Sequence, residues 1–434
     1  MISRGAVSSS LAVPRLLLIA PHGSYRTSAF MNAAQQMGVD VLLASEGKHS
    51  VISDYAEGLH INFQEPATTL KQILSAARQR PFAAILGTDD STTTLAAIAS
   101  EQLGLPHNDK KSVELTQRKD LARACLQQHK VPAPRYQRLD LQEKIRPQVK
   151  DFSFPAVVKP VALSGSRGVI RVNTMSELEQ ACLRIDKILQ TELSLDEESR
   201  HFILLEEYVS GSEVAVEGLL INGKLQLLTI FDKPEPMEGP FFEETYYISP
   251  SRLPISIQDD VQATIQAACH AYGLREGPVH AECRINDKGI WVLEVAARTI
   301  GGMCGHLLSH GIGQNLETLV IQHALNIPIK INKDKGAAGV LMIPIPKAGV
   351  LKRVEGILKA QAVEGIDEVN IQISSGHRIQ TLPEASSYLG FIFAYADTPE
   401  QVESALREAH ACLNIVIDPF LPISVQPLKS NANE

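Results

Sequence analysis

The stretch Pro155-Ala-Val-Val-Lys-Pro-Val-Ala-Leu-Ser-Gly-Ser-Arg-Gly-Val169 decides how the middle of the chain folds. Its apolar run at 156–160, with Lys159 near the end, predicts a buried strand. The segment Ser164-Gly-Ser-Arg-Gly168, rich in small residues, begins five positions after Lys159 and predicts a loop. One fixed cation beside a loop with unobstructed backbone N–H groups is what a phosphate cradle needs. An ordinary turn beside a solvent-reaching lysine is the alternative.

The segment around this loop, from about residue 133 to 210, has the pattern of a compact α+β subdomain. A strand at 169–172, a helix at 176–189 and a strand at 202–206 follow the loop in turn. The prolines of Val131-Pro-Ala-Pro134 mark its upstream boundary. A helix is expected before them at 115–129, and it places Lys119 and Arg123 one turn apart.

The chain before residue 107 alternates strands with helices, which predicts a parallel sheet covered on both faces. Expected strands are 15–20, 39–44 and 82–86, and expected helices run up to residue 37 and over 68–80 and 91–103. Pro21-His-Gly-Ser24 lacks the spaced glycines of a dinucleotide loop, so we interpret it as a structural turn. Asp89 and Asp90 either cap the next helix or touch a ligand at the sheet edge.

Two hairpins and a last unit follow downstream. Alternating residues on either side of Asn222-Gly223 indicate an antiparallel hairpin over 213–221 and 225–231. A helix at 259–272 leads into a second hairpin. In the last unit, which begins at residue 336, the expected elements are strands at 337–345, 369–374 and 390–396 and a helix at 399–412.

The charge balance favours small-molecule chemistry. The 434 residues carry 41 Lys and Arg against 49 Asp and Glu, a net charge of −8, so we expect no nucleic-acid and no membrane partner. The apolar run at 16–20 is too short for a membrane anchor or a signal peptide. Six scattered cysteines without CxxC pairs favour a reduced, cytoplasmic setting.

Two acids lie in otherwise apolar strands of the second hairpin. Glu282 and Glu294 each have an apolar residue on both sides, in strands expected at 279–285 and 289–295. The tight turn between the strands lets the two carboxylates face one another. Buried carboxylates without partners are costly, and a divalent cation is the simplest compensation. Acids that point outward from an edge strand are the alternative.

Together these pieces resemble the ATP-grasp superfamily of ligases in order and spacing. The motifs that carry this resemblance are Lys119, Val157-Val-Lys-Pro160 with its loop, Leu205-Glu-Glu-Tyr-Val209, and Glu282 with Leu293-Glu-Val-Ala-Ala-Arg298. The segment 336–349, with Leu389-Gly-Phe391, resembles the C-terminal domain of the L-amino acid ligases. The resemblance implies an ATP-grasp fold of mixed α/β and α+β class. Its parts would be a loose tail at 1–13, a Rossmann-like domain at 14–110, an ATP-grasp domain at 111–335 and a ligase-associated α+β domain at 336–427.

The resemblance also implies a nucleotide site. The residues expected to contact ATP are Lys119, Lys159, Ser164, Gly165, Ser166, Gly168, Glu206, Glu207, Tyr208, Val209 and Glu213. The two lysines match the phosphate ligands, and the Ser/Gly loop would cover the phosphates. Residues 206–209 fall where the interdomain hinge contacts adenine, and Glu213 falls where ribose often binds. A polar strand end and a solvated strand residue are the structural alternatives for these last two.

The metal and substrate groups follow from the same resemblance. Glu282 and Glu294 match the ligands of Mg²⁺, or of Mn²⁺ in its place, and Glu294 is a catalytic candidate too. Many members have an asparagine two residues after the second glutamate, where this chain has Ala296, so one usual ligand is missing. Arg298 matches the catalytic electrophile, which would stabilise the acyl-phosphate and the oxyanion; a purely structural arginine is the alternative.

Further substrate contacts are expected on both sides of these strands. Gly301 and Gly302 would let backbone approach the substrate beside Arg298. The loop 238–247, dense in aromatics and acids, would close over the substrate, with Glu244 at the amine. His280 and His306 also lie nearby in sequence, although a lone histidine is more often structural.

The function expected from the resemblance is an ATP-dependent, ADP-forming carboxylate–amine ligase whose partners are small molecules. Its product would be a dipeptide or a related amide. The alternatives are a biotin carboxylase-like or nucleotide-biosynthesis ligase, and a non-catalytic ATP-binding module. No Met-Lys-Met biotin acceptor segment occurs in the chain. The two substrates and the oligomeric state stay open, with a homodimer among the options.

Overall fold

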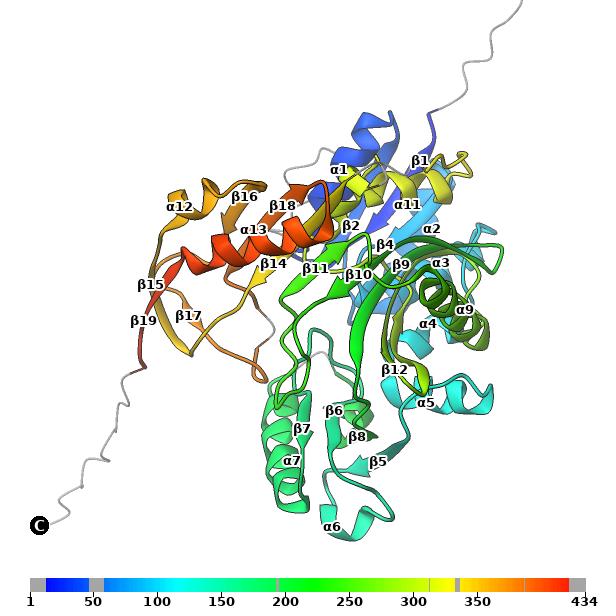
Figure 1. The fold of residues 1–434 in the computed structure, drawn as a ribbon. Helices are drawn as coiled ribbons and strands as arrows, with labels where there is room; N and C mark the ends of the chain where they lie inside the picture. Colours follow the sequence, from blue (N-terminus) through cyan, green and yellow to red (C-terminus); the bar gives the residue numbers. More distant parts are fainter. Residues whose placement is uncertain are drawn as a thin grey trace, which may run out of the picture.

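A computed structural model describes residues 13–46, 58–192, 195–311, 313–331, 336–385 and 387–420. Most of the tail expected at 1–13, and residues 332–335 just before the last unit, lie outside the described residues. Figure 1 shows four parts: the N-terminal sheet, a small lobe at the bottom, a long central sheet, and a C-terminal part on the left. In the described ranges, no helix has the length and apolar character needed to cross a bilayer.

The N-terminal domain is a parallel sheet in the order β3-β2-β1-β4. Its elements are β1 (Arg15–Ile19), α1 (Arg26–Gln36), β2 (Asp40–Glu46), β3 (Gly58–Ile61), α2 (Pro66–Gln79), β4 (Ala84–Gly87) and α3 (Asp90–Gln102). Side chains of β1 alternate between two cores: Leu16 and Leu18 share one with α1, while Leu17 and Ile19 share the other with α2 and α3. This confirms the doubly covered parallel sheet.

The single helix expected at 115–129 is wrong, because two helices occupy this region. They are α4 (Lys110–Gln117) and α5 (Lys119–Gln128), separated by an extended Arg118. The Arg118 guanidinium donates to Asp120 at 3.0 and 2.9 Å. The Lys119 N–H donates to Val161 O at 2.8 Å, which ties the start of α5 to the segment after Lys159.

The small lobe is an antiparallel sheet, β5-β8-β6-β7, with one long helix against it (Figure 1). Its elements are β5 (Tyr136–Asp140), α6 (Ile145–Gln148), β6 (Ala156–Pro160), β7 (Ile170–Val172), α7 (Met175–Gln190), α8 (Glu197–His201) and β8 (Phe202–Glu207). Leu178, Ile185 and other apolar residues of α7 pack on the sheet. The strands and the helix follow one another in the order expected around Lys159.

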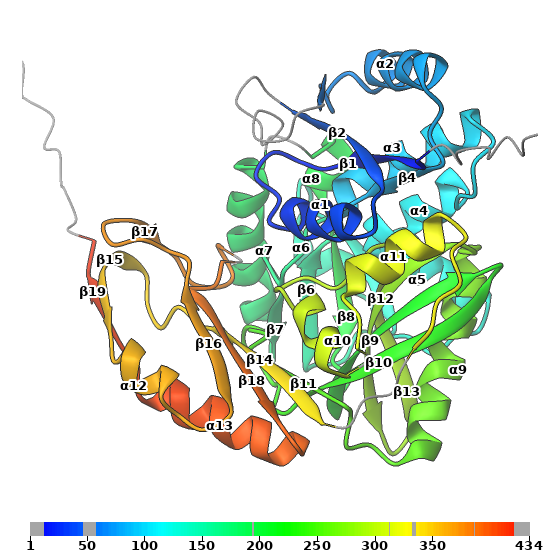
Figure 2. The same cartoon turned by 90° about the horizontal axis from the view of Figure 1, so that it is seen from above.

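The central sheet has eight strands in the order β13-β12-β9-β10-β11-β14-β18-β16. The strands are β9 (Ser212–Ile221), β10 (Lys224–Lys233), β11 (Tyr246–Ser249), β12 (Gly277–Asn286), β13 (Gly289–Ala296), β14 (Ala337–Ile343), β16 (Ile366–Ile371) and β18 (Gly390–Ala396). α9 (Ile255–Tyr272) covers one face, and α10 (Gly305–Gly311) and α11 (Leu316–Ala324) cover the other. Figure 2 shows α11 lying beside α1 of the first domain.

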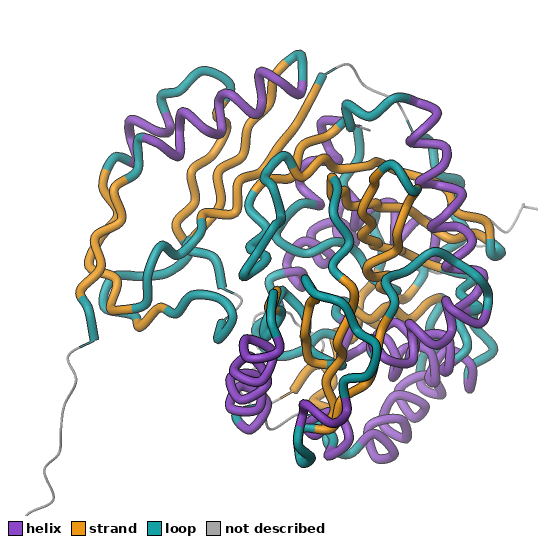
Figure 3. Tube along the Cα trace, turned by 60° about the horizontal axis from the view of Figure 1, so that its bottom comes forward, coloured by secondary structure: helices purple, strands orange, loops and turns teal. Residues whose placement is uncertain are grey.

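The C-terminal part continues the central sheet through β14, β18 and β16. Its other elements are β15 (Gly349–Glu355), α12 (Ile357–Gln361), β17 (Arg378–Ile379), α13 (Pro399–Ala411) and β19 (Asn414–Asp418). In Figure 3 the helices of this part run along the outer face of its strands. Gly339 permits this packing, because a Cβ there would meet Val402 of α13 at 2.5 Å.

Candidate active site

One face of the central sheet carries a row of charged side chains. Its members are Glu213 and Glu217 of β9, Lys233 of β10, His280, Glu282 and Arg284 of β12, and Glu294 of β13. Directly opposite residues of antiparallel strands share a face, so the register gathers all seven on the same side. The intervening residues, such as Val214 and Val216, pack with α9 on the other side.

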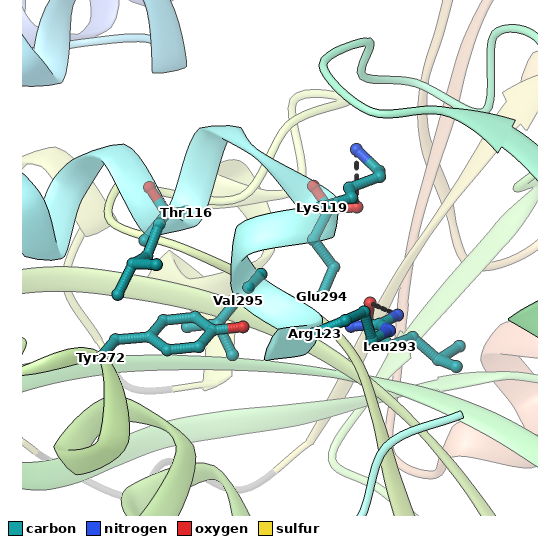
Figure 4. A pocket seen from close by; sticks show the side chains of 9 residues that line it. Thr116, Lys119, Arg123, Tyr272, Leu293, Glu294 and Val295 are labelled. Carbon is teal, nitrogen blue, oxygen red and sulfur yellow. Dashed lines mark hydrogen bonds and ion pairs between the residues drawn. The ribbon is translucent and has the colours of Figure 1, made fainter. Parts of the chain in front are cut away.

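Glu282 and Glu294 are opposite one another across β12 and β13, as the hairpin predicts. The Glu294 carboxylate is 3.5 Å from Lys119 Nζ, which also donates to Leu163 O at 2.7 Å. Figure 4 shows Lys119 at the start of its helix with Glu294 beneath it. The two acid side chains are 16% and 31% exposed, so neither points into bulk solvent.

Sequence reasoning missed Lys233, which lies among three of the expected site carboxylates. Its Nζ is 2.8 Å from Glu213, 3.1 Å from Glu244 and 2.7 Å from Glu282. Burial would lower the pKa of Lys233, but the three carboxylates raise it well above its ordinary value. A sequence signal exists: Asp232-Lys-Pro234 ends a strand as Val158-Lys-Pro160 does.

The acids around Lys233 have unequal affinities for protons. Burial and then Glu282 raise the pKa of Glu244 to about 7. Burial also acts to raise the pKa of Glu282, but Lys233 and His280 outweigh it and hold that pKa well below its ordinary value. Carboxylate oxygens of Glu213, Glu244 and Glu282 lie within 4.8 Å of one another, and the single Lys233 ammonium donates to all three and offsets part of their charge.

Replacing Lys233 by Met should lower the free energy of unfolding by about 3 kcal/mol or more, because three carboxylates lose a shared buried partner. Thermal and urea unfolding measure this change. Lys288→Met on the exposed turn after β12 is the matched control and should unfold like the wild-type chain. Equal stability of the Lys233 and Lys288 variants would show that the cluster does not depend on the ammonium.

Lys159 forms an ion pair with a buried acid, Glu206. Glu206 is 3% exposed, and its oxygens are 2.6 Å from Lys159 Nζ and 2.7 Å from Arg123 Nε. Burial lowers the pKa of Lys159 in spite of Glu206, and Arg123 and Lys119 lower it further. An anion bound beside Lys159 would favour the charged form of this lysine. The Glu206 side chain therefore orients Lys159, and its contact with adenine stays a prediction.

The segment after Glu206 is anchored by Arg284. Its guanidinium donates to Val209 O at 2.6 Å and to Glu213 at 2.9 Å, and it lies over the Tyr208 ring. Glu213 is therefore a buried, paired residue, and the solvated alternative is wrong. Glu207 is exposed at the end of β8. The adenine and ribose roles of these residues stay predictions.

The Ser/Gly loop rests against the C-terminal part of the chain. Gly165 and Gly168 have positive φ, and so does Ser166 between them. The Gly168 N–H donates to Pro383 O at 3.0 Å, and a Cβ at Gly168 would meet the Pro160 ring at 2.8 Å. Ser164 precedes the turn. The phosphate contacts expected for this loop stay predictions.

The N-terminal domain reaches the segment around Arg298. Arg298 Nε donates to Asp90 at 3.0 Å, and Tyr25 OH accepts from the Gly302 N–H at 3.0 Å. Burial would lower the pKa of Arg298, but Asp90 and Glu294 raise it. Asp89 caps α3 and pairs with Arg26, as the capping alternative predicts, and a ligand contact of Asp90 stays a prediction. Sequence reasoning offered no signal for Tyr25 or Arg26.

The remaining expected residues lie around the same face. Glu244 accepts from Tyr247 OH at 2.8 Å, in addition to its contact with Lys233. The ring of His280 lies between two carboxylates, with Nδ1 3.3 Å from Glu217 and Nε2 3.8 Å from Glu282, so it belongs to the row of charged side chains. His306 packs near the Phe393 ring, with centroids 5.8 Å apart. Gly301 lies against Arg26, since a Cβ there would be 3.3 Å from its guanidinium.

Three known domain families match the chain in succession. They are the ATP-grasp N-terminal domain at 31–107, the ATP-grasp domain at 152–306 and the L-amino acid ligase C-terminal domain 2 at 341–418. Among solved structures, an L-amino acid ligase from Bacillus licheniformis matches with a TM-score of 0.82 and 25% identity, over 93% of this chain and 99% of that one. Solved phosphoribosylglycinamide synthetase, carboxyaminoimidazole ribonucleotide synthetases and biotin carboxylases match at 13–16% identity with TM-scores of 0.64–0.70, which shows a shared fold.

Curated relatives are more distant. The uncharacterized protein y4rH of Sinorhizobium fredii is 24% identical over 73% of this chain and 64% of its own length. Dapdiamide A synthase of Enterobacter agglomerans is 24% identical over 59% of this chain and 61% of its own length. The chain thus spans less than two thirds of either relative. Two ATP-grasp matches in order, followed by a match to an L-amino acid ligase C-terminal domain, show that the chain belongs to the ATP-grasp superfamily, and its fold is similar to that of a solved L-amino acid ligase along almost its whole length.

Proposed function

We propose that the chain is an ATP-dependent, ADP-forming ligase that joins an amino acid carboxylate to an amine, giving a dipeptide or a related amide. The observation that carries this proposal is the direct pairing of Glu282 with Glu294, with Lys119 3.5 Å from Glu294. The match of residues 341–418 to an L-amino acid ligase domain supports the substrate class.

The residues at this face fit Mg²⁺ and a triphosphate. Glu282 and Glu294 offer carboxylate oxygens, the ligands that Mg²⁺ prefers, and Mn²⁺ accepts the same donors. Ala296 is buried and adds no donor. Lys119 and Lys159 supply two cations for the phosphates. When bound, Mg²⁺ would offset phosphate charge and orient the γ-phosphate for transfer.

The chain's own groups account for the rest of the reaction. The substrate carboxylate attacks the γ-phosphate while Lys119 and Lys159 hold the phosphates, giving ADP and an acyl-phosphate. An amine then displaces phosphate, and Arg298 stabilises the oxyanion that forms. Arg298 exchanges its bond to Asp90 for the substrate in this step. Rate enhancement comes from holding charged reactants together, because the reaction needs no protein nucleophile.

A matrix of amino acid pairs with ATP and Mg²⁺ tests the function. Phosphate release and product mass are followed for each pair, and at least one pair should give ADP, phosphate and an amide in equal amounts. Phosphate without amide in every pair would favour a ligase of purine biosynthesis or a biotin carboxylase-like enzyme, which share this fold. ATP binding without phosphate release would favour a non-catalytic module.

The setting proposed for this enzyme is the cytoplasm. All six cysteines lie in the described ranges and are free thiols, which suits a reducing compartment. Small molecules are its proposed partners, and association of two copies as a homodimer stays a prediction that light scattering can test.

A further inference from the structure

Glu217 is a buried carboxylate that the proposed reaction does not use. It lies in the middle of β9 and is 0% exposed. Its partners in the described part of the chain are the Ile300 N–H and the ring of His280. Burial raises its pKa, which reflects the cost of a charge removed from water. An apolar side chain would fill this place at lower cost, so stability alone does not account for an acid here.

The first contact of Glu217 fixes the segment that carries Arg298. The Ile300 N–H donates to both carboxylate oxygens, each at 3.2 Å. Residues 297–300 follow β13 without regular secondary structure, and the backbone hydrogen bonds of the turn that leads into α10 begin only at Gly301. Arg298 itself reaches Asp90 on one side, and Glu217 holds the backbone two residues later.

The second contact of Glu217 is an ion-pair distance to the ring of His280. Glu217 and His280 are opposite one another in β9 and β12, with Glu217 Oε2 3.3 Å from Nδ1. The other ring nitrogen, Nε2, is 3.8 Å from Glu282 Oε1. A carboxylate at one imidazole nitrogen sets the orientation of the ring and the direction of the other nitrogen. Glu217 therefore contacts both the histidine beside Glu282 and the backbone two residues after Arg298.

We propose that Glu217 is a positioning residue, which keeps the Arg298–Gly302 segment and the His280 ring aligned with Glu282 during the second half of the reaction. This role rests on the proposed function. When the segment loosens, Arg298 no longer holds the acyl-phosphate against the amine, and water takes the place of the amine. Attack by water on the acyl carbon returns the carboxylate and releases phosphate, so ATP is spent without an amide.

Glu217→Met tests the role, because it keeps the size of the side chain and removes both acceptor oxygens. Hydrogen exchange of the peptide containing Ile300 should rise at least about tenfold, and amide formation should fall about 10- to 100-fold. The ratio of phosphate to amide should rise, while ADP without Mg²⁺ should bind with wild-type affinity, because the lysines and the hinge are untouched. Glu217→Gln keeps one acceptor for Ile300 and should restore part of the rate.

Leu219→Met is the matched control, since Leu219 is equally buried on the same face of β9, two residues away. It should keep wild-type exchange and coupling. Wild-type exchange and coupling in Glu217→Met would overturn the proposal, and so would equal effects in Leu219→Met. If the wild-type chain makes no amide with any amine, the proposed function fails. Exchange at Ile300 then still decides whether Glu217 holds the segment.

Discussion

Glu294→Gln should abolish turnover and leave the fold intact. The amide keeps the size of the carboxylate and can still accept from Lys119, 3.5 Å away, so unfolding should change little. The variant loses one of the two carboxylates, on neighbouring strands, that would hold Mg²⁺. Lewis-acid assistance is worth several kcal/mol, so kcat should fall about 10³-fold or more. Initial rates of phosphate release, beside thermal unfolding, measure both quantities.

Asp287→Asn is the control for this variant. Asp287 is an exposed acid on the turn of the same hairpin, and its loss changes the net charge by the same amount. The control should react at the wild-type rate. A wild-type rate in Glu294→Gln as well would remove Glu294 from the mechanism.

Arg298→Ala should lower kcat about 10²- to 10³-fold, the usual cost of one lost oxyanion donor. The affinity for MgADP should stay unchanged, because the expected nucleotide contacts lie at the start of α5, in the small lobe and on β9. Asp90 loses its partner, but its side chain is 32% exposed and can turn to water, so the fold should persist. Steady-state rates, MgADP titration and thermal unfolding separate these effects.

Arg298→Lys extends this test, because a lysine keeps the charge and loses the planar fork of donors. We expect it to recover little activity. Arg275→Ala, at an exposed arginine before β12, is the matched control and should keep full activity. Activity within a factor of two of wild type in Arg298→Ala would assign this arginine a structural role.

The parts of the site that sequence could predict are those fixed by local rules. Glu282 and Glu294 face one another because a tight turn at 286–289 sets the register of two adjacent strands. Lys159 was identifiable because a strand and a small-residue loop flank it within ten positions. In both cases the chemistry and the geometry lie in one short stretch.

The other parts depend on contacts between distant positions. Asp90 and Arg298 are separated by 208 residues, and a single sequence contains no distance between them. Lys233 meets Glu282 only because β9 lies between β10 and β12. The break between α4 and α5 was missed because the Lys119 N–H donates to the carbonyl of Val161, a distant residue that the helical periodicity does not include.

Short strands were missed for a further reason. β3, β15 and β19 have few buried residues, and their burial patterns lack the continuous apolar run that marks β1. Their place is decided by neighbouring strands, which supply hydrogen-bond partners. The continuous eight-stranded sheet was missed as well, because a change in composition at residue 336 suggested a separate unit.

The strand β11 joins the two halves of that sheet unequally. It pairs with β14 along its whole length but with β10 only at Asp232 and Ile248. Tyr247, whose hydroxyl donates to Glu244, therefore takes its position from the C-terminal strands. A chimera that exchanges residues 336–420 between two relatives would shift this tyrosine without altering a single residue of the ATP-grasp domain. Under the proposed function, inherited differences in amine choice can thus arise from residues that never meet the amine.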